Sequence, residues 1–95
     1  MSYDLQFLPS ALKEWQKLGA PLQTQFKKKL IERLEHPHVP ADALHGMANH
    51  YKIKLRSSGY RLVYQVIDHE VVVFVVAVDR REREQAYRKA AERLK

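Results

Sequence analysis

The stretch YKIKLRSSGYRLVYQVIDHEVVVFVVAV, residues 51–78, decides the fold. Polar and apolar residues alternate over residues 51–56, which is typical of a strand with one buried face. Ser57-Ser58-Gly59 is a turn signal, and residues 60–67 form a second predicted strand. After another short turn, the apolar run over residues 71–78 predicts a strand that is buried on both faces or central in the sheet. Three strands joined by tight turns predict an antiparallel sheet.

Upstream of this stretch, the sequence predicts one further strand and a helical hairpin. Residues 3–8 alternate in polarity, which suits a short strand with one buried face. Pro9 can begin a helix because its missing N–H costs nothing there, and Gly19 is a natural stop. Pro21 begins a second helix almost at once, and this helix ends before Pro37. Because the link between the helices is so short, we expect them to form a hairpin.

The last part of the chain predicts a third, weakly docked helix. From residue 79 the sequence is rich in charge, and its thin apolar stripe is mostly alanine: Ala86, Ala90, Ala91 and Leu94. Alanine buries little apolar surface, so this helix should dock less tightly than the first two. The complete order β-α-α-β-β-β-α predicts one α+β domain over residues 1–95. An antiparallel sheet of about four strands would pack against the N-terminal hairpin, with a C-terminal helix.

Composition narrows the function classes. The 95 residues carry 17 Lys and Arg against 11 Asp and Glu, a net charge of +6, and no cysteine. The lack of cysteine excludes disulfides, thiol nucleophiles and Cys-ligated zinc. The longest apolar run has eight residues, against roughly 20 needed to span a bilayer, and the N-terminus lacks a signal-peptide pattern. We therefore expect a soluble, cytoplasmic domain with a polyanionic partner and no membrane partner.

Positive charge is concentrated in the predicted sheet. Residues 50–63 contain no acid but four basic residues: Lys52, Lys54, Arg56 and Arg61. If Ser58-Gly59 forms a two-residue hairpin loop, Arg56 pairs with Arg61 and Lys54 pairs with Val63. All four cations then share one face, because alternate residues of a strand point the same way. The opposite face receives an apolar set that suits a core: Ile53, Leu55, Leu62 and Tyr64.

This basic face predicts an anion site. Like charges directly opposite each other in a sheet are destabilising, with cross-strand terms of roughly 0.2–1 kcal/mol. Four cations without a counter-charge therefore suggest that a ligand supplies the negative charge. The alternative is an ordinary solvated outer face that binds nothing.

A second anion-binding feature is Asp79-Arg80-Arg81-Glu82, which resembles a capping box with Asp79 as the N-cap of the last helix. Arg80 and Arg81 would then occupy the first turn, where the macrodipole disfavours cations and backbone N–H groups bind phosphate. We expect Arg81 to act as a phosphate clamp; the alternative is that both arginines extend into water. Tyr87, further along this helix, is either a core aromatic or a stacking partner for a base.

The histidines predict neither a metal nor a cofactor. All five lie in the loop before the sheet or at a turn: His36, His38, His45, His50 and His69. None has metal-ligand spacing or a recognisable Ser or Asp partner. His45 is notable because it precedes Gly46 close to the basic strand.

The run Leu44-His45-Gly46-Met47, followed by YKIKLRSSGYRLVYQV at residues 51–66, resembles the RelE toxins of RelBE toxin–antitoxin pairs, in the RelE/ParE superfamily. The sequences ALKEW at residues 11–15 and VVVFV at residues 71–75 belong to the same resemblance, which covers essentially the whole chain. A strand-turn-strand match of this length is highly specific.

The resemblance implies an mRNA interferase, an endoribonuclease that enters the ribosomal A site and cuts the codon there. It implies a metal-independent catalytic set, all of which is present: Lys52, Lys54, Arg61, Arg81 and Tyr87. Further RNA or ribosome contacts are expected from Arg56, His45, Arg80, Arg83, Lys27 and Lys28. The family's best-known member has arginine where this chain has His45, so one auxiliary RNA contact is altered.

The expected chemistry is attack by the RNA 2′-OH on the adjacent phosphate, leaving a 2′,3′-cyclic phosphate and a 5′-OH. This reaction needs a base, an acid and stabilisation of the phosphorane. No His–Glu pair is evident, so the lysines and arginines must supply the base, the acid and the charge stabilisation. Clustered like charges disfavour protonated lysine, and we expect Lys52 as the base and Lys54 as an acid or charge stabiliser. Arg61 and Arg81 would hold the phosphate, and Tyr87 would stack on or orient the nucleotide.

Partners follow from the same resemblance. A RelB-like antitoxin is expected to wrap the toxin and displace its alanine-based last helix, and the pair is expected to act as a corepressor on operator DNA. Two other function classes stay open: a ParE-like gyrase inhibitor and a non-catalytic ribosome- or RNA-binding module. An inactive toxin that serves only as a corepressor is a further possibility.

Overall fold

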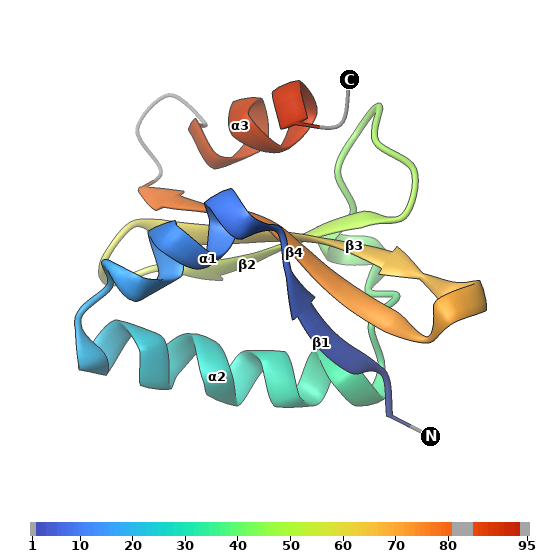
Figure 1. The fold of residues 1–95 in the computed structure, drawn as a ribbon, viewed down its shortest axis with the longest axis horizontal. Helices are drawn as coiled ribbons and strands as arrows, with labels where there is room; N and C mark the ends of the chain where they lie inside the picture. The colour runs from blue at the N-terminus through green and yellow to red at the C-terminus, as the bar shows by residue number, and fades with distance from the viewer. Residues whose placement is uncertain (1, 81–84, 94–95) are drawn as a thin grey trace.

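The computed structural model describes residues 2–80 and 85–93. Within them, four strands form one sheet and three α-helices cover its two faces (Figure 1). The radius of gyration is 12.1 Å, as expected for about 100 residues in one compact unit. The elements are β1 (Asp4–Phe7), α1 (Pro9–Gln16), α2 (Ala20–Glu35), β2 (His50–Leu55), β3 (Tyr60–Ile67), β4 (Val72–Arg80) and α3 (Gln85–Arg93), with short 3₁₀ turns at Pro40–Asp42 and Asp68–Glu70.

The strand order is β1-β4-β3-β2, so β4 is central, as its apolar run predicts. β2, β3 and β4 are antiparallel neighbours, but β1 pairs with β4 in parallel. The expectation of a wholly antiparallel sheet is therefore wrong at β1. No tight turn joins β1 to β4, and the chain runs through both helices, β2 and β3 between them. Hairpin geometry thus fixes the directions of β2, β3 and β4 but not that of β1.

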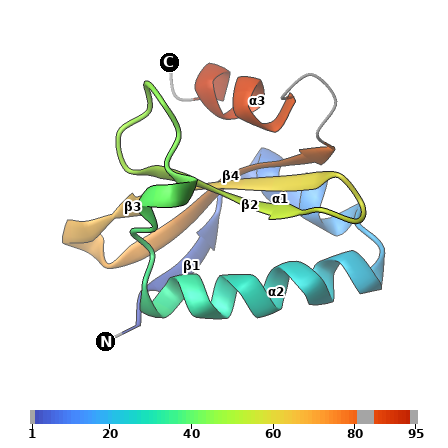
Figure 2. The same cartoon turned by 180° about the vertical axis from the view of Figure 1, so that it is seen from behind.

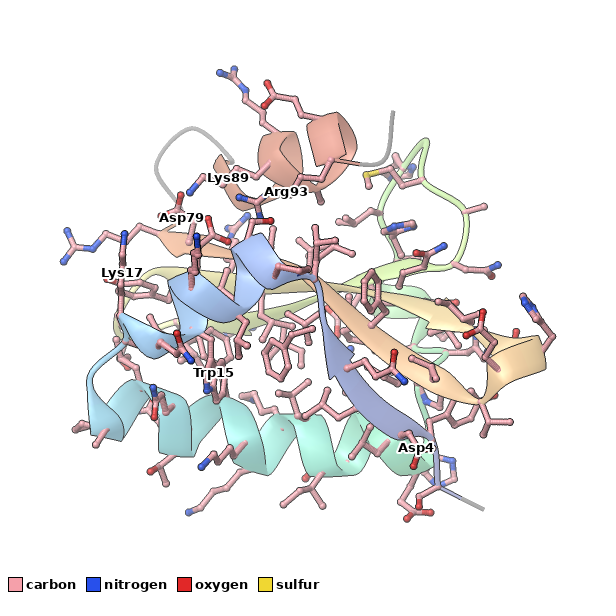
Figure 3. All side chains as sticks on the ribbon, in the orientation of Figure 1. Asp4, Trp15, Lys17, Asp79, Lys89 and Arg93 are labelled. Atoms are coloured by element: carbon pink, nitrogen blue, oxygen red, sulfur yellow. The ribbon has the colours of Figure 1, made fainter. Side chains whose placement is uncertain are left out.

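The helical hairpin covers one face of the sheet, which we call the hairpin face. Trp15 of α1 lies between its helix and α2 (Figure 3), 5.5 Å from the Phe7 ring and 6.1 Å from the Phe26 ring. Leu30 adds a second buried residue from α2. The apolar set predicted from strand alternation is buried in the same core: Ile53, Leu55, Leu62 and Tyr64. The predicted hairpin and its core are confirmed.

α3 covers the opposite face, which we call the α3 face (Figures 1 and 2). Among the described residues the core on this face is small: Ala90 packs with Val63, Val76 and Ala77, and Leu44, Met47 and Phe74 lie against them. A register shift between Val63 and Tyr64 marks a bulge in the β3–β4 pair. Val63 pairs with Ala77 while Tyr64 pairs with Val75, so Val76 is the extra residue.

The β2–β3 turn differs from the two-residue loop predicted for Ser58-Gly59. Leu55 pairs with Tyr60 and Lys54 pairs with Arg61, so the turn spans residues 56–59. Gly59 has φ +75°, and its N–H donates to the carbonyl of Leu55 at 2.9 Å, which closes this longer turn. The pairing is shifted by two residues, and a shift of two preserves the faces on which the side chains lie.

The predicted capping box at Asp79 is wrong. β4 continues through Arg80, with Arg61 opposite Asp79 and Tyr60 opposite Arg80. The pairing with β3 keeps both residues extended, so Asp79 is not an N-cap and Arg80 is not in a first helical turn. Glu82, the other member of the predicted box, lies outside the described residues.

Candidate functional site

Three of the predicted catalytic residues lie on the α3 face. Lys52 and Lys54 come from β2, and Arg61 comes from β3 directly opposite Lys54. Strand alternation puts both lysines on the same side as Arg61. Two of these cations, Lys54 and Arg61, line a hollow of about 420 Å³, together with Leu55, Arg56, Gly59 and Tyr60. The sequence therefore predicted correctly that these three cations share a face.

Arg56 does not extend that face, contrary to the prediction. It lies in the turn of residues 56–59 and is exposed. Because the turn takes up four residues, Arg56 has no partner position on β3 and is not opposite Arg61. It still lines the hollow, so it can meet an anion bound there from the rim.

The three cations differ in burial. Arg61 is only 8% exposed, Lys52 is half-buried and Lys54 is exposed. A buried arginine presents a fixed, planar set of donors, which suits bidentate contact with a phosphate. An anion that entered the hollow would meet Arg61 as the more buried of its two strand cations and Lys54 as the more exposed one.

The predicted absence of a counter-charge on this face is wrong. Asp79 of β4 lies directly opposite Arg61, and it forms an ion pair with Lys89 of α3 (Figure 3). Lys89 also donates to Glu14 of α1 at 2.7 Å. Burial opposes the charged form of Lys89, but these carboxylates outweigh it and raise its pKa. Asp79 of β4 and Glu14 of α1 thus hold α3 in place through Lys89.

Glu14 is the centre of this ionic network, which sequence reasoning missed. It accepts from Arg93 at 3.0 Å and from the Val78 N–H at 3.1 Å, besides Lys89. Its burial would raise its pKa, yet the hydrogen bonds from Arg93, Lys89 and Val78 hold the pKa below its usual range. No local pattern links residues of α1, β4 and α3, so only the fold brings them together.

Arg80 lies at the rim of the site. Its guanidinium is 5.5 Å from the centre of the Tyr60 ring, and Tyr60 lines the basic hollow. Arg80 is exposed, and it comes from the end of β4. It can therefore approach an anion in the hollow from a strand end and not, as predicted, from a helix start.

The other predicted contacts are spread over the molecule. His45 is exposed in the loop before β2, whose Leu44 and Met47 pack on the α3 face. Lys27 and Lys28 are exposed on α2, on the hairpin side of the sheet, so they are not brought together with the basic hollow. Three predicted residues lie outside what the structure describes: Arg81 and Arg83 entirely, and Tyr87 in its side chain, although its backbone belongs to α3.

His50, at the start of β2, is a further buried polar group that sequence reasoning placed in a loop. It is 5% exposed, and its Nδ1 is 2.8 Å from the carbonyl of Ala48. Its Nε2 is buried without a hydrogen-bond partner. Burial lowers its pKa, outweighing the bond to Ala48. His50 is therefore a buried polar residue at the start of the strand that carries Lys52 and Lys54.

Among the described residues, no group of three or more His, Cys, Asp and Glu side chains could hold a metal ion. A helix with the length and apolar character needed to span a bilayer is likewise absent from the described part of the chain.

Comparisons with known proteins indicate the family of this chain. A profile of the ParE toxin of the type II toxin–antitoxin system parDE matches residues 5–85. The mRNA interferase toxin RelE of Escherichia coli K12 is 58% identical over 94 residues, 99% of each chain. The mRNA interferase RelE of Shigella flexneri has the same identity and coverage.

Solved structures show the same similarity. A mutant of E. coli RelE in the free state has a TM-score of 0.92 and 56% identity, covering all of both chains. RelE in the intact E. coli RelBE toxin–antitoxin complex has a TM-score of 0.82 and 61% identity, covering 83% of this chain and 96% of that one. With its four-stranded sheet, basic α3 face and matching sequence, the chain belongs to the ParE toxin family of type II toxin–antitoxin systems and resembles its RelE members over its full length.

Proposed function

We propose that this protein is the toxin of a type II toxin–antitoxin system and acts as a ribosome-dependent mRNA interferase. The observation that carries the proposal is the placement of Lys52, Lys54 and Arg61 on one face, where Lys54 and Arg61 line the basic hollow. It is supported by 58% identity to relatives named mRNA interferase. The expected substrate is mRNA held in the A site of the ribosome, and the protein is expected to act in the cytoplasm.

The chemistry is RNA cleavage by the 2′-OH of the nucleotide before the scissile phosphate. Lys52 takes the 2′-OH proton, and Lys54 donates to the leaving 5′ oxygen or stabilises the developing charge. Arg61 binds the phosphate oxygens, because a buried guanidinium can neutralise the phosphorane without rearranging. Arg81 and Tyr87 complete the set by resemblance, as a phosphate contact and a contact to the nucleotide.

Dependence on the ribosome follows from the weakness of these groups as bases. Two lysines and two arginines gain most when the RNA is already held with its 2′-OH in line with the phosphate. The A site of the ribosome supplies that geometry, and free RNA does not. The basic rim residues Arg56 and Arg80 would contact the ribosome or the mRNA backbone around the site.

A RelB-like antitoxin is the expected protein partner, since E. coli RelE is solved in complex with RelB and with a RelB peptide. We propose that the antitoxin displaces α3, whose apolar contact is limited to Ala90 among its residues with described side chains. Bound together, toxin and antitoxin would act as a corepressor on operator DNA.

Primer extension on a translated mRNA tests the function. Wild type should cut within the A-site codon on ribosomes and leave the same RNA intact when it is naked. Lys54→Met should slow cleavage by at least about 100-fold, because it removes a proton-transfer group. Lys13→Met, at an exposed position of α1, is the matched control and should cleave normally. Equal cleavage of naked RNA would refute ribosome dependence.

The same protein should leave gyrase active in a supercoiling assay. Inhibition of supercoiling without A-site cuts would establish the ParE-like function instead. Ribosome binding without any cut would establish a non-catalytic binding module.

A further inference from the structure

Lys52 lies on a strand whose outer edge is closed by groups from elsewhere in the chain. β2 is the last strand of the sheet, and the carbonyls of His50 and Lys52 accept hydrogen bonds from groups outside the sheet. The His50 carbonyl accepts the N–H of Leu44 at 3.0 Å, in the loop that runs beside β2. Two residues along, the Lys52 carbonyl accepts Nη1 of Arg33 at 3.3 Å. A side chain from α2 thus takes the place of a neighbouring strand.

Arg33 is held firmly in that position. Its side chain is 14% exposed, and Nη2 forms an ion pair with Asp42 at 2.6 Å. Nη1 also donates to the Tyr64 hydroxyl at 2.8 Å, and the guanidinium lies 5.7 Å from the centre of that ring. The Tyr64 hydroxyl donates in turn to the Pro37 carbonyl at 2.7 Å. One guanidinium therefore joins α2, the loop before β2 and the two strands of the catalytic hairpin.

At the opposite edge of the sheet, a charged helix side chain likewise bonds the main chain of a strand. β1 pairs with β4 only over residues 72–75, and beyond it the Val78 N–H donates to Glu14 of α1. Charged helix side chains therefore fix the main chain of both strands. At β4, Glu14 and also Arg93, which donates to the Val76 carbonyl at 2.9 Å, hold the strand that carries Asp79. At β2, Arg33 holds the strand that carries Lys52.

We propose that Arg33 is a positioning residue that fixes Lys52 for catalysis by anchoring its main-chain carbonyl. This inference rests on the proposed function, in which Lys52 takes the 2′-OH proton. An edge strand without the anchor can bend or twist, and small displacements of a reacting group are costly. A misplacement of about 1 Å can slow a reaction by about 100-fold. Arg33 itself lies behind the strand and does not touch RNA.

Three variants distinguish the positioning role of Arg33 from an effect of its charge and from an effect of its packing against Tyr64. Arg33→Met keeps an unbranched stem against Tyr64 but removes every donor. Arg33→Lys keeps the charge but cannot hold Lys52, Tyr64 and Asp42 at once, because an ammonium lacks the planar fork. Asp42→Asn leaves Arg33 in place but removes its charged partner. Lys29→Met, at an exposed position one turn earlier on α2, removes the same charge without touching β2.

The readout is the rate of A-site cleavage over a range of ribosome concentrations, which separates kcat from KM. Arg33→Met and Arg33→Lys should lower kcat by about 10- to 100-fold while KM stays within about twofold. Asp42→Asn should give a smaller loss of kcat, and Lys29→Met should leave kcat unchanged. Far-UV circular dichroism and Tm verify that each variant is folded at the assay temperature.

The outcomes are distinct. A normal kcat in folded Arg33→Met overturns the positioning role, and a loss confined to KM shows that Arg33 serves ribosome binding by its charge. If Arg33→Met is unfolded, Arg33→Lys and Asp42→Asn are used for the test instead. A normal kcat in both of these variants overturns the positioning role. If wild type itself does not cut on ribosomes, the proposed function has failed, and the role of Arg33 fails with it.

Discussion

Under α1 and α2 the sheet packs through large side chains such as Trp15, Phe26 and Tyr64, whereas under α3 it packs through Val63, Ala77 and Ala90. Burial of an aromatic or leucine side chain contributes far more than burial of an alanine. The hairpin face therefore holds the fold together. The α3 face adds an ionic network centred on Glu14 and carries the candidate active site.

This difference has a functional consequence. Among the described side chains of α3, only Ala90 joins the apolar core, and ion pairs supply the other contacts. We expect a helix held in this way to have a low local stability, so that another chain can replace it without unfolding the rest of the domain. The basic residues lie on the same side as this helix. A partner that replaces α3 can therefore reach the active site while the hairpin face remains intact.

The largest effect should come from the hairpin face. Phe26 is fully buried, and Phe26→Ala should lower the free energy of unfolding by about 3–5 kcal/mol. Ile31→Ala is the control on the same helix, because Ile31 is 65% exposed; it should change stability by less than about 0.5 kcal/mol. Urea denaturation measures both. A similar cost for the two variants would contradict the placement of the core.

A smaller effect, confined to α3, is expected from Glu14→Gln. Glu14 loses its charge while its partners Lys89 and Arg93 remain, which should cost about 1–3 kcal/mol. Hydrogen exchange should speed up in α3 and stay unchanged in β3. Glu32→Gln, at an exposed position of α2, is the matched control. Unchanged protection of α3 in Glu14→Gln would show that the ionic network does not hold the helix.

The pH dependence of stability tests the buried histidine of the α3 face. Burial lowers the pKa of His50 below its ordinary value of 6.5, so the unfolded chain takes up a proton more readily than the folded one. The contribution of His50 to the free energy of unfolding is complete above pH 6.5, and it is lost as the pH falls toward the lowered pKa. His50→Gln should flatten the stability curve just below pH 6.5, and His36→Gln, at an exposed position, should not. Identical curves for wild type and His50→Gln would contradict this assignment.

The smallest effect is expected from the basic residues of the hairpin side. If Lys27 and Lys28 contact the ribosome, their double substitution by alanine should raise KM by about threefold, leave kcat unchanged and weaken the salt dependence of binding. Lys13→Ala on α1 is the control. An unaltered salt dependence would show that neither lysine contacts the ribosome. A lowered kcat would contradict their separation from the active site.

Local sequence patterns predicted the elements and the faces well, because both depend on near neighbours. The alternation in β2 and β3 put Ile53 and Leu62 into the core and Lys54 and Arg61 on the other side, as observed. Two predictions failed because the strands end elsewhere than expected. Arg56 lies in the four-residue turn and not in the strand, and β4 extends to Arg80, where the sequence predicted the start of a helix.

The sequence by itself determined that Lys52, Lys54 and Arg61 share one face, because side chains alternate with a period of two and the register differed from expectation by two residues. Tertiary structure alone decided what surrounds them. The bulge at Val76 reverses the alternation in β4 and turns Asp79 toward Arg61. α2 brings Arg33 to the Lys52 carbonyl, and α1 brings Glu14 to Lys89. These contacts join residues far apart in the chain, so no local pattern encodes them.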